Sequence, residues 1–324
     1  MKALLRKIEV ITIKHIQREN VWDGRTDEDE ASLRYHQVVS LQDSKTLQAN
    51  DAKAFSIIGF QCDEGVRRNQ GRVGAAMAPN EIRKHLASIP YTLPKSTQTV
   101  DVGNVRCVDG ALEKAQRTLG EHVSTLFNKN YIPIILGGGH ETFYGHYLGV
   151  RQAVGEKDSI GMINIDAHFD LRVDDIPSSG TMFHQILSED SNAGYFCLGI
   201  QPLSNTETLF KEAKKHKCTY VFEEDVMQEH TFKMIDSFSQ NHDHLIVTLC
   251  TDSIVSTAAP GVSAPSPFGL EPKVVKQLLR YIVSKRNIRS FDISEVNPKF
   301  DNNSQTSRLA AYIVADVMHY FVGE

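Results

Sequence analysis

Short apolar segments without polar alternation recur along this 324-residue chain, and each is followed by a segment of helical periodicity. They read "AFSIIGF", "YIPIILGGG", "SIGMINID", "GYFCLGI", "TYVF", "HLIVTLCT" and "IRSFDIS". Apolar strands that alternate with amphipathic helices are typical of a parallel sheet covered by helices on both faces. The pattern therefore predicts an α/β fold with a central parallel sheet, in which ligands bind beyond the carboxyl ends of the strands.

The first fifty residues differ from the rest, since they are polar and irregular and include the charged run "WDGRTDEDEASLRYHQVV". No internal repeat and no Pro/Ser-rich linker follows residue 50. We therefore expect residues 1–50 to form an N-terminal arm and residues 51–324 to form a single domain.

Composition narrows the class of partner and the compartment. The net charge is -5 without a dense Lys/Arg run, so we expect neither nucleic acid nor an anionic membrane as a partner. Five unclustered cysteines indicate neither a disulfide framework nor a CxxC zinc site, and they suit a reducing compartment. The first twenty residues are charged throughout and lack a long apolar run, so we expect no secretory signal or membrane span, and a cytoplasmic protein.

The segment "NIDAHFDLR" carries the strongest chemical signal. Asp166, His168 and Asp170 stand two residues apart directly after a buried strand, so an extended segment would project all three on one side. Such a cluster is costly to bury unless a cation or partner neutralises it. Imidazole combined with carboxylate oxygens suits Mn²⁺ and can also suit Zn²⁺, which predicts a metal site at this strand end.

Other strand ends carry weaker signals. His140 follows three glycines in "ILGGGHE", and Asp292 and Glu295 lie in "SFDISEVNP". His184 lies in "SGTMFHQ", which we interpret as a Gly/Ser loop. Each of these residues, taken alone, is as typical of a structural position as of a functional one. The chain has no GxGxxG or GxxxxGK[ST] motif that would indicate a phosphate-binding loop.

Together and in this order, these motifs resemble the ureohydrolase family, which comprises arginases, agmatinases and formimidoylglutamases. The resemblance runs from about Phe55 onward and is carried by "GGGHE", "DAHFDLR", "SGTMFH", "CTDSIVSTAAPGVSAP" and "SEVNP". Within the family, "GVRRNQGRVGAAMAPNEIR", "WDGR" followed by "RYHQ", and "APGVSAPSP" are most similar to the formimidoylglutamase branch. The resemblance implies a three-layer α/β/α, arginase-like catalytic domain over residues 51–324, a two-manganese centre and a homo-oligomer.

The resemblance also implies roles for individual residues. Asp170 would accept a hydrogen bond from the attacking water. His184 would transfer a proton to the departing amine, and Glu295 would hold the cationic nitrogen group of the substrate. The implied metal ligands are His140, Asp166, His168, Asp170, Cys250 and Asp252.

The implied reaction is metal-dependent hydrolysis of N-formimidoyl-L-glutamate, a small-molecule substrate, to L-glutamate and formamide, a step of histidine degradation. Because the substrate has two carboxylates, its site needs cationic partners, and arginine forms bidentate pairs with carboxylates. Arg172 follows the ligand motif directly, and "GVRRNQGR" holds Arg67, Arg68 and Arg72. We expect Arg172, Arg68 and Arg72 to bind the substrate.

One position departs from the family pattern. The family has two aspartates two residues apart at this strand end, whereas this chain has Cys250 in the first place and Asp252 in the second. Manganese prefers oxygen donors, and a thiolate favours softer ions such as Zn²⁺ or Fe²⁺. Four interpretations of Cys250 stay open: an inert core thiol, a bridge between two metal ions, a ligand of one ion, or a sign that one ion is weakly held or absent.

Two alternatives to the leading function also stay open. One is a hydrolase of another guanidino or amidino compound, including a single-metal, deacetylase-like amidohydrolase. The other is a metal-poor, non-catalytic relative that acts as a binding or regulatory subunit, and Cys250 is the feature that favours it. The number of metal ions per chain separates these alternatives from the leading function.

Overall fold

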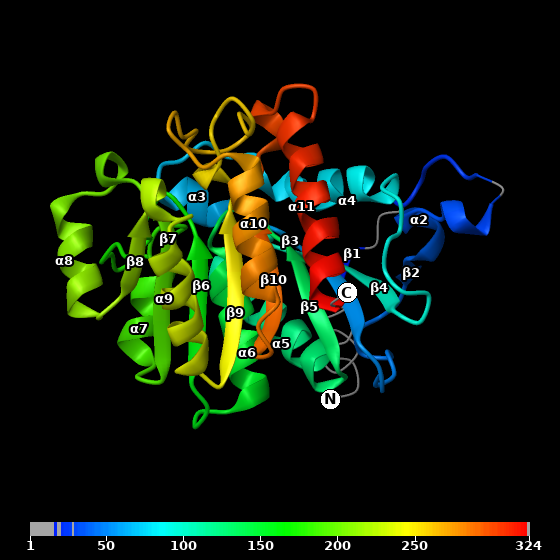
Figure 1. Cartoon of the computed structure of the whole chain (residues 1–324), viewed down its shortest axis with the longest axis horizontal. Helices are drawn as coiled ribbons and strands as arrows, with labels where there is room; N and C mark the ends of the chain where they lie inside the picture. Colours follow the sequence, from blue (N-terminus) through cyan, green and yellow to red (C-terminus); the bar gives the residue numbers. More distant parts are fainter. Residues whose placement is uncertain (1–15, 18–20, 28, 323–324) are drawn as a thin grey trace.

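One twisted sheet runs through the molecule in the computed structural model, which describes residues 16–17, 21–27 and 29–322 (Figure 1). In this described part the sheet has ten strands in the order β1-β4-β3-β5-β10-β9-β6-β7-β8, and β2 also pairs with β4. All pairs are parallel except that of β1 with β4. The strands are β1 (Ile16–Gln17), β2 (Ser40–Leu41), β3 (Ala54–Gln61), β4 (Gln98–Arg106), β5 (Tyr131–Leu136), β6 (Ile160–Ile165), β7 (Ala193–Ile200), β8 (Thr219–Phe222), β9 (His244–Cys250) and β10 (Ile288–Ser294).

Helices cover both faces of the sheet and enclose two separate cores. Neighbouring residues of β3 illustrate this division, because Ile57 packs into one core and Ile58 into the other. One core includes α4 (Ala78–Ala87), α9 (Glu229–Gln240), α10 (Pro272–Val283) and α11 (Gln305–Val322). The other includes α5 (Leu112–Asn128), α6 (Thr142–Val154), α7 (Met182–Glu189) and α8 (Glu207–Lys215). The predicted three-layer α/β/α fold with a central parallel sheet is confirmed. Two shorter helices are α2 (Tyr35–Val38), whose Tyr35 packs into the first core, and α3 (Glu64–Arg68).

Strand β4 is a buried strand that the apolar pattern does not predict, because its interior contains Asp101 and Asn104. Arg83 of α4 donates to both carboxylate oxygens of Asp101 at 2.8 Å each and to Oδ1 of Asn104 at 2.5 Å. Trp22 Nε1 donates to Asp101 Oδ2 at 2.7 Å. These charge-assisted bonds offset the cost of burying the carboxylate.

The segment before β3 packs on the domain through Trp22, through β2 and through Ser44. Trp22 is buried, and β2 extends the sheet by pairing Ser40 with Val100. Further along, Ser44 Oγ lies 2.7 Å from Nδ1 of His122 in α5. The predicted boundary at residue 50 therefore falls between two strands of one sheet.

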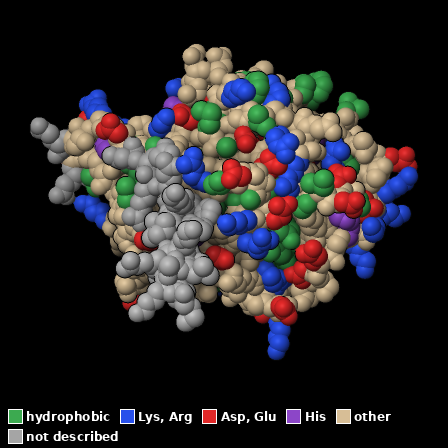
Figure 2. Space-filling model, turned by 180° about the vertical axis from the view of Figure 1, so that it is seen from behind, with side chains coloured by type: hydrophobic (Ala, Val, Ile, Leu, Met, Phe, Trp, Pro, Cys, Tyr) green, Lys and Arg blue, Asp and Glu red, His purple; other side chains and the backbone are tan. Residues whose placement is uncertain are grey.

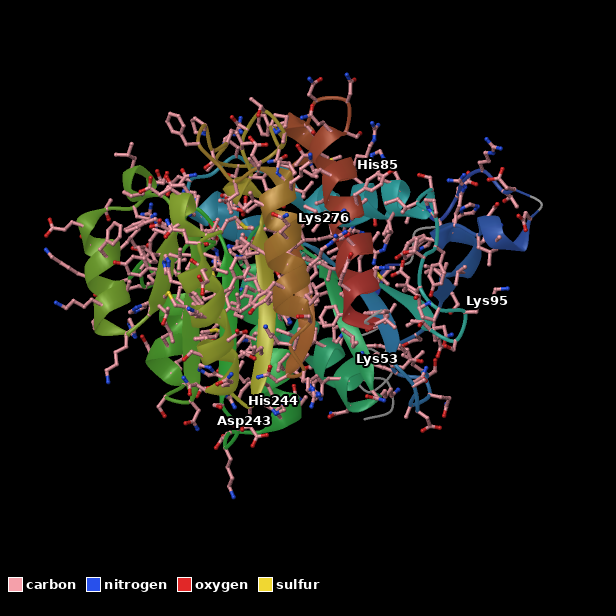
Figure 3. All side chains as sticks on the ribbon, in the orientation of Figure 1. Lys53, His85, Lys95, Asp243, His244 and Lys276 are labelled. Carbon is pink, nitrogen blue, oxygen red and sulfur yellow. The ribbon has the colours of Figure 1, made fainter. Side chains whose placement is uncertain are left out.

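The carboxyl ends of the parallel strands meet at one edge of the sheet. In Figure 3, Asp243 and His244 mark the amino end of β9 at the bottom of the view, so the carboxyl edge lies at the top. The face shown in Figure 2 has basic and acidic side chains interspersed over its described part. No helix among the described residues is long and apolar enough to cross a membrane.

Candidate metal centre

Four strands that are neighbours in the sheet deliver the predicted ligands to its carboxyl edge. They lie in the order β5-β10-β9-β6. His140 follows β5, Glu295 follows β10, Cys250 ends β9, and Asp166 follows β6. Residues 155 apart in sequence thereby come into hydrogen-bond contact, since the backbone N of His140 donates to Glu295 Oε1 at 2.8 Å.

The three glycines before His140 allow this close approach. A Cβ on Gly137 would overlap Ser294 Oγ and the carbonyl oxygen of Ile293 in β10, and a Cβ on Gly138 would overlap the carbonyl oxygen of Cys62. The backbone N of Glu295 donates to the carbonyl of Gly138 at 2.8 Å, so β5 and β10 stay joined beyond their strands. Glycine is required here because the backbones of these segments touch.

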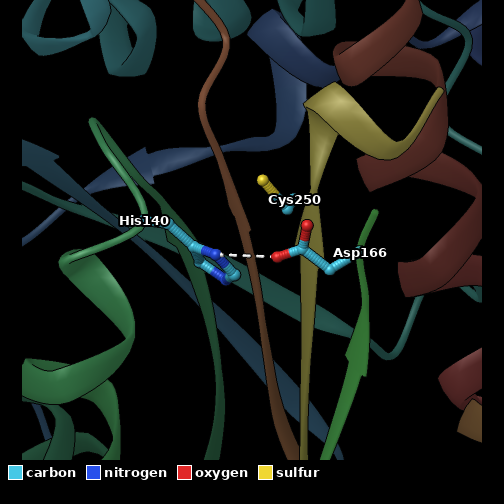
Figure 4. A group of neighbouring side chains, drawn as sticks. All are labelled: His140, Asp166 and Cys250. Atoms are coloured by element: carbon cyan, nitrogen blue, oxygen red, sulfur yellow. Dashed lines mark ion pairs between the residues drawn. The ribbon is translucent and has the colours of Figure 1, made fainter. Parts of the chain in front are cut away.

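The ring of His140 is held with Nδ1 toward two carboxylates. Nδ1 lies 2.9 Å from Asp170 Oδ2 and 3.1 Å from Asp166 Oδ2 (Figure 4). On its other side, Nε2 lies 3.0 Å from Thr248 Oγ1. The Thr248 hydroxyl donates its single proton to Asp292 Oδ1 at 2.8 Å, so its oxygen accepts from His140 Nε2–H. With Nε2–H directed at Thr248, Nδ1 faces the two carboxylates as a donor, and a metal ion bound at Nδ1 would replace that proton.

Behind Thr248 the polar chain continues into the core. Asp292 Oδ2 lies 2.7 Å from Nδ1 of His146, whose Nε2 contacts Ser290 Oγ. Asp292, His146 and Ser290 are fully buried. Outer-shell groups of this kind fix the tautomer and orientation of a ligating histidine.

Ligand-type atoms form two overlapping groups at this edge. His140, Asp166 and Cys250 form one, and Asp166, His168 and Asp252 form the other, with the ligand atoms of each group within 4.8 Å of one another. His168 Nδ1 lies 3.5 Å from Asp166 Oδ1 and 3.6 Å from Asp252 Oδ2. The two groups share Asp166, an arrangement that suits two adjacent cations. The nitrogen and oxygen donors fit divalent metal ions, with one sulfur among them.

Because the cluster is buried, neighbouring charges shift the pKa values of its carboxyl groups strongly. Burial and the neighbouring charge of Asp166 raise the pKa of Asp170 to about 6. Burial of Asp166 acts in the same direction, but hydrogen bonds with His140 and His168 outweigh it and lower the pKa of this carboxyl. The positive charge of His140 and His168 thus stabilises the ionised form of the buried Asp166 carboxylate. Bound cations stabilise ionised carboxylates in the same way.

Cys250 lies inside the cluster. Its side chain is buried, and Figure 4 shows its sulfur beside His140 and Asp166. Sγ donates to Asp252 Oδ1 across 2.8 Å. Burial, reinforced by the charges of Asp166 and Asp252, raises the pKa of the thiol well above its ordinary value. Its position beside His140 and Asp166 is that of a metal ligand.

Two residues of the centre have left-handed backbone conformations that are uncommon outside glycine. The φ angles are +50° at Asp170 and +68° at Glu295. Such strain concentrates at functional sites. Glu295 also has a buried carboxylate oxygen, Oε2, with no hydrogen-bond partner among the described residues. This unpaired oxygen can accept hydrogen bonds from a cationic ligand.

The predicted substrate arginines differ in availability. Arg68 donates to Glu64, Glu113 and two backbone carbonyls, so its guanidinium is occupied by structural contacts. Arg72 donates to the carbonyls of residues 262 and 263. These contacts do not support the expected role of either residue in substrate binding. Arg172 is exposed and has no carboxylate partner among the described residues, which leaves it available for an anion.

Residue 184 lies in helix α7 rather than in a loop, so that part of the interpretation is wrong. Among the described residues, no hydrogen bond, ion pair or ring contact joins His184 to the six predicted ligands, and its ring lies beside Glu212 and His216. The preceding residue, Phe183, lies edge-on to the ring of His140 at 5.9 Å and stacks on Tyr195 at 4.0 Å. This placement does not support the predicted role of His184 in proton transfer, which stays a prediction outside the function proposed below.

Phe183 and Thr248 are the site residues that the motifs do not identify. Thr248 stands two residues before Cys250 on the same strand, so alternation along β9 is the signal that could have revealed it. For Phe183 the sequence offers no comparable signal.

Comparisons with known proteins agree with this geometry. The arginase family model matches residues 53–320. A formimidoylglutamase from Geobacillus sp. (strain WCH70) is 54% identical over 306 residues, which cover 93% of this chain and 94% of the relative. A formimidoylglutamase from Lysinibacillus sphaericus is 48% identical over 309 residues, covering 93% and 96%.

Solved structures share the fold at lower sequence identity. The crystal structure of formimidoylglutamase from Bacillus subtilis has a TM-score of 0.82 at 22% identity and covers 98% of this chain and 99% of that one. Trypanosoma cruzi formiminoglutamase with Mn²⁺ has a TM-score of 0.76 at 23% identity, covering 87% and 99%. From the family match, the two close relatives and the shared fold, we conclude that the chain belongs to the arginase family.

Proposed function

We propose that this protein hydrolyses N-formimidoyl-L-glutamate to L-glutamate and formamide, as a cytoplasmic step of histidine degradation. The observation that carries the proposal is the pair of ligand groups sharing Asp166, with the unpaired oxygen of Glu295 on a neighbouring strand. The relatives named formimidoylglutamase, up to 54% identical over nearly the whole chain, support the choice of substrate.

Manganese is the metal that we propose for the centre. Carboxylate and imidazole donors suit Mn²⁺, and the Trypanosoma cruzi formiminoglutamase structure contains this ion. His140, Asp166, Asp170 and Cys250 would hold one ion, and Asp166, His168, Cys250 and Asp252 the other. When bound, such ions act as Lewis acids and lower the pKa of a water molecule toward neutrality.

The side chains around the centre would position the reactants. Asp170 accepts a hydrogen bond from the attacking water and directs it toward the amidine carbon. Glu295 Oε2 accepts hydrogen bonds from the amidine nitrogens, and its other oxygen is fixed by the backbone N of His140. Arg172 pairs with a carboxylate of the glutamate moiety.

Product analysis tests this proposal directly. The purified chain, loaded with Mn²⁺, is assayed with formimidoylglutamate, arginine and agmatine, and formamide, glutamate and urea are measured. We expect formamide and glutamate in equal amounts from the first substrate and no urea from the others. His168→Ala provides the inactive control.

Counting the bound metal ions separates the remaining possibilities. Two Mn²⁺ ions per chain with formamide release support the proposal. Preferential urea release would reassign the substrate, and a metal-free, inactive chain would indicate a non-catalytic relative. The expected homo-oligomer is checked on the same preparation by light scattering.

A further inference from the structure

A second group of ligand-type side chains lies between α7 and α8, and the proposed reaction does not use it. It consists of His184 of α7, Glu212 of α8, and His216, which directly follows α8. Glu212 and His216 are four residues apart, so the helix presents both on one side. His184 faces them from the neighbouring helix, and its ring centroid lies 5.3 Å from that of His216.

The two imidazoles converge on a single carboxylate oxygen without bonding to it. His184 Nδ1 lies 3.8 Å and His216 Nε2 lies 3.6 Å from Glu212 Oε2. Both distances exceed the range of a hydrogen bond. Both nitrogens are also buried and lack a hydrogen-bond partner among the described residues. Unsatisfied buried nitrogens are costly, and two that face one carboxylate call for a missing partner.

We propose that His184, Glu212 and His216 bind a zinc ion that joins α7 to α8. Zn²⁺ binds imidazole nitrogen and carboxylate oxygen at about 2.0–2.2 Å in tetrahedral geometry, which separates neighbouring ligand atoms by roughly 3.3 Å. The observed separations of 3.6 and 3.8 Å approach that value. Small rotations of the three side chains complete the site, and a water molecule supplies the fourth ligand.

A protonated histidine paired with Glu212 does not explain the cluster. In such a pair the histidine nitrogen would approach the carboxylate oxygen to hydrogen-bond distance, which neither histidine does. In addition, Lys215 Nζ already pairs with Glu212 Oε2 at 2.9 Å. Burial, followed by the proximity of His184, lowers the pKa of His216, which favours the neutral ring that metals bind. The Lys215 side chain is 61% exposed, so its pair with Glu212 is weak and gives way to a metal ion.

The position of the site indicates a structural role. His184 directly follows Phe183, whose ring lies against His140. An ion that fixes α7 to α8 also fixes the position of Phe183 at the metal centre. Zinc at this second site therefore stabilises the fold near the centre without taking part in the reaction.

The test counts zinc on the full-length protein. Parent, Glu212→Gln and His216→Ala chains are incubated with Zn²⁺, freed of unbound ion by gel filtration and assayed for zinc per chain by atomic emission. We expect the parent to bind one ion more than either variant and to gain a zinc-dependent rise in melting temperature that both variants lose. His230→Ala, which removes an exposed histidine of α9, is the matched control and should bind as the parent does.

A gain-of-affinity variant makes the test sharper. Lys215→Ala removes the cation that competes for Glu212, so it should tighten zinc binding several-fold. Mn²⁺-loaded His216→Ala should keep the parent's hydrolytic activity. Unchanged activity would show that the zinc missing from this variant had been bound at the second site and not at the metal centre. Equal zinc counts in the parent, Glu212→Gln and His216→Ala would overturn the proposal. So would a zinc-soaked crystal without anomalous density between the three side chains.

Discussion

The thiol of Cys250 donates a hydrogen bond to the carboxylate of Asp252, two residues further along the chain, at 2.8 Å. A metal ion bound by both residues replaces this proton. The contact thus joins the unusual residue of the centre to a predicted ligand, and it makes residue 250 the most informative position for mutation.

Cys250→Asp is expected to bind Mn²⁺ at least as tightly as the parent, with a preference shifted away from Zn²⁺, because it provides the paired carboxylates that manganese prefers. Cys250→Ser should lower metal affinity, since a neutral hydroxyl is a poorer donor than a thiolate. Metal stoichiometry and melting temperature are measured for both variants. A melting loss in Cys250→Asp that Mn²⁺ fails to reverse would show that residue 250 is only a packing position.

Thr248→Val should weaken Mn²⁺ binding about 10- to 100-fold, which is typical when the outer-shell partner of a ligating histidine is lost. The substitution keeps the shape of the side chain but leaves His140 Nε2 and Asp292 Oδ1 without their shared hydroxyl. Thr248→Ser, which retains the hydroxyl, should restore the affinity. Equilibrium dialysis against Mn²⁺ measures both, and equal affinities for Val and Ser would contradict the role assigned to Thr248.

Glu295→Gln should reduce kcat/KM for formimidoylglutamate by about 100-fold, equivalent to roughly 3 kcal/mol for a charge-assisted hydrogen bond. The glutamine carbonyl can still accept from the backbone N of His140, but its amide nitrogen cannot accept from an amidinium group. Metal content and melting temperature should therefore stay at the parent's values. If activity is unchanged, Glu295 does not contact the substrate.

Arg172→Ala should raise the KM for formimidoylglutamate roughly tenfold, a loss of about 1.4 kcal/mol that suits an exposed charge pair closing on a substrate. Its kcat should change less, because the proposed contact is with a carboxylate of the glutamate moiety and not with the amidine group that reacts. Arg67→Ala is the matched control, since that guanidinium already pairs with Glu64 at 2.6 and 2.7 Å. Equal KM values for the two variants would remove Arg172 from the substrate site.

His122 is expected to make the fold sensitive to acid. Burial lowers the pKa of this ring from 6.5 to about 4, so below pH 6.5 the unfolded chain binds a proton that the folded chain does not. The free energy of unfolding should therefore fall as the pH drops from 6.5 to 4, by about 3 kcal/mol for this group. In metal-free protein, His122→Gln should remove that part of the decline, and the exposed His230→Gln should retain it. Identical pH profiles for all three chains would contradict the prediction.

The sequence predicts the central strands well because each is a continuous apolar run. It does not predict β4, since Asp101 is buried only because Arg83 and Trp22 reach it from other segments. Contacts of that kind depend on tertiary structure and leave no local pattern. The side-chain partners of a polar strand decide its burial, and these are known only once the chain has folded.

The same distinction applies to the site. The convergence of His140, Asp166 and Cys250 is predictable, because parallel strands end at one edge. The orientation of His184 is not, because the rotation of α7 about its axis directs Phe183 to the metal centre and His184 toward α8. Similarly, Arg68 is occupied by the carbonyl of Pro177, which is 109 residues distant.

The place of β10 in the sheet has a consequence for biosynthesis. In the described sheet β10 alone joins β5 to β9, and without it the strands divide into one block ending at β5 and another beginning at β9. His140 belongs to the first block, while the other predicted ligands belong to the second. A nascent chain that has not yet exposed β10 lacks the strand that aligns His140 with Asp166. We therefore expect the full metal complement to be acquired only after this strand has been translated.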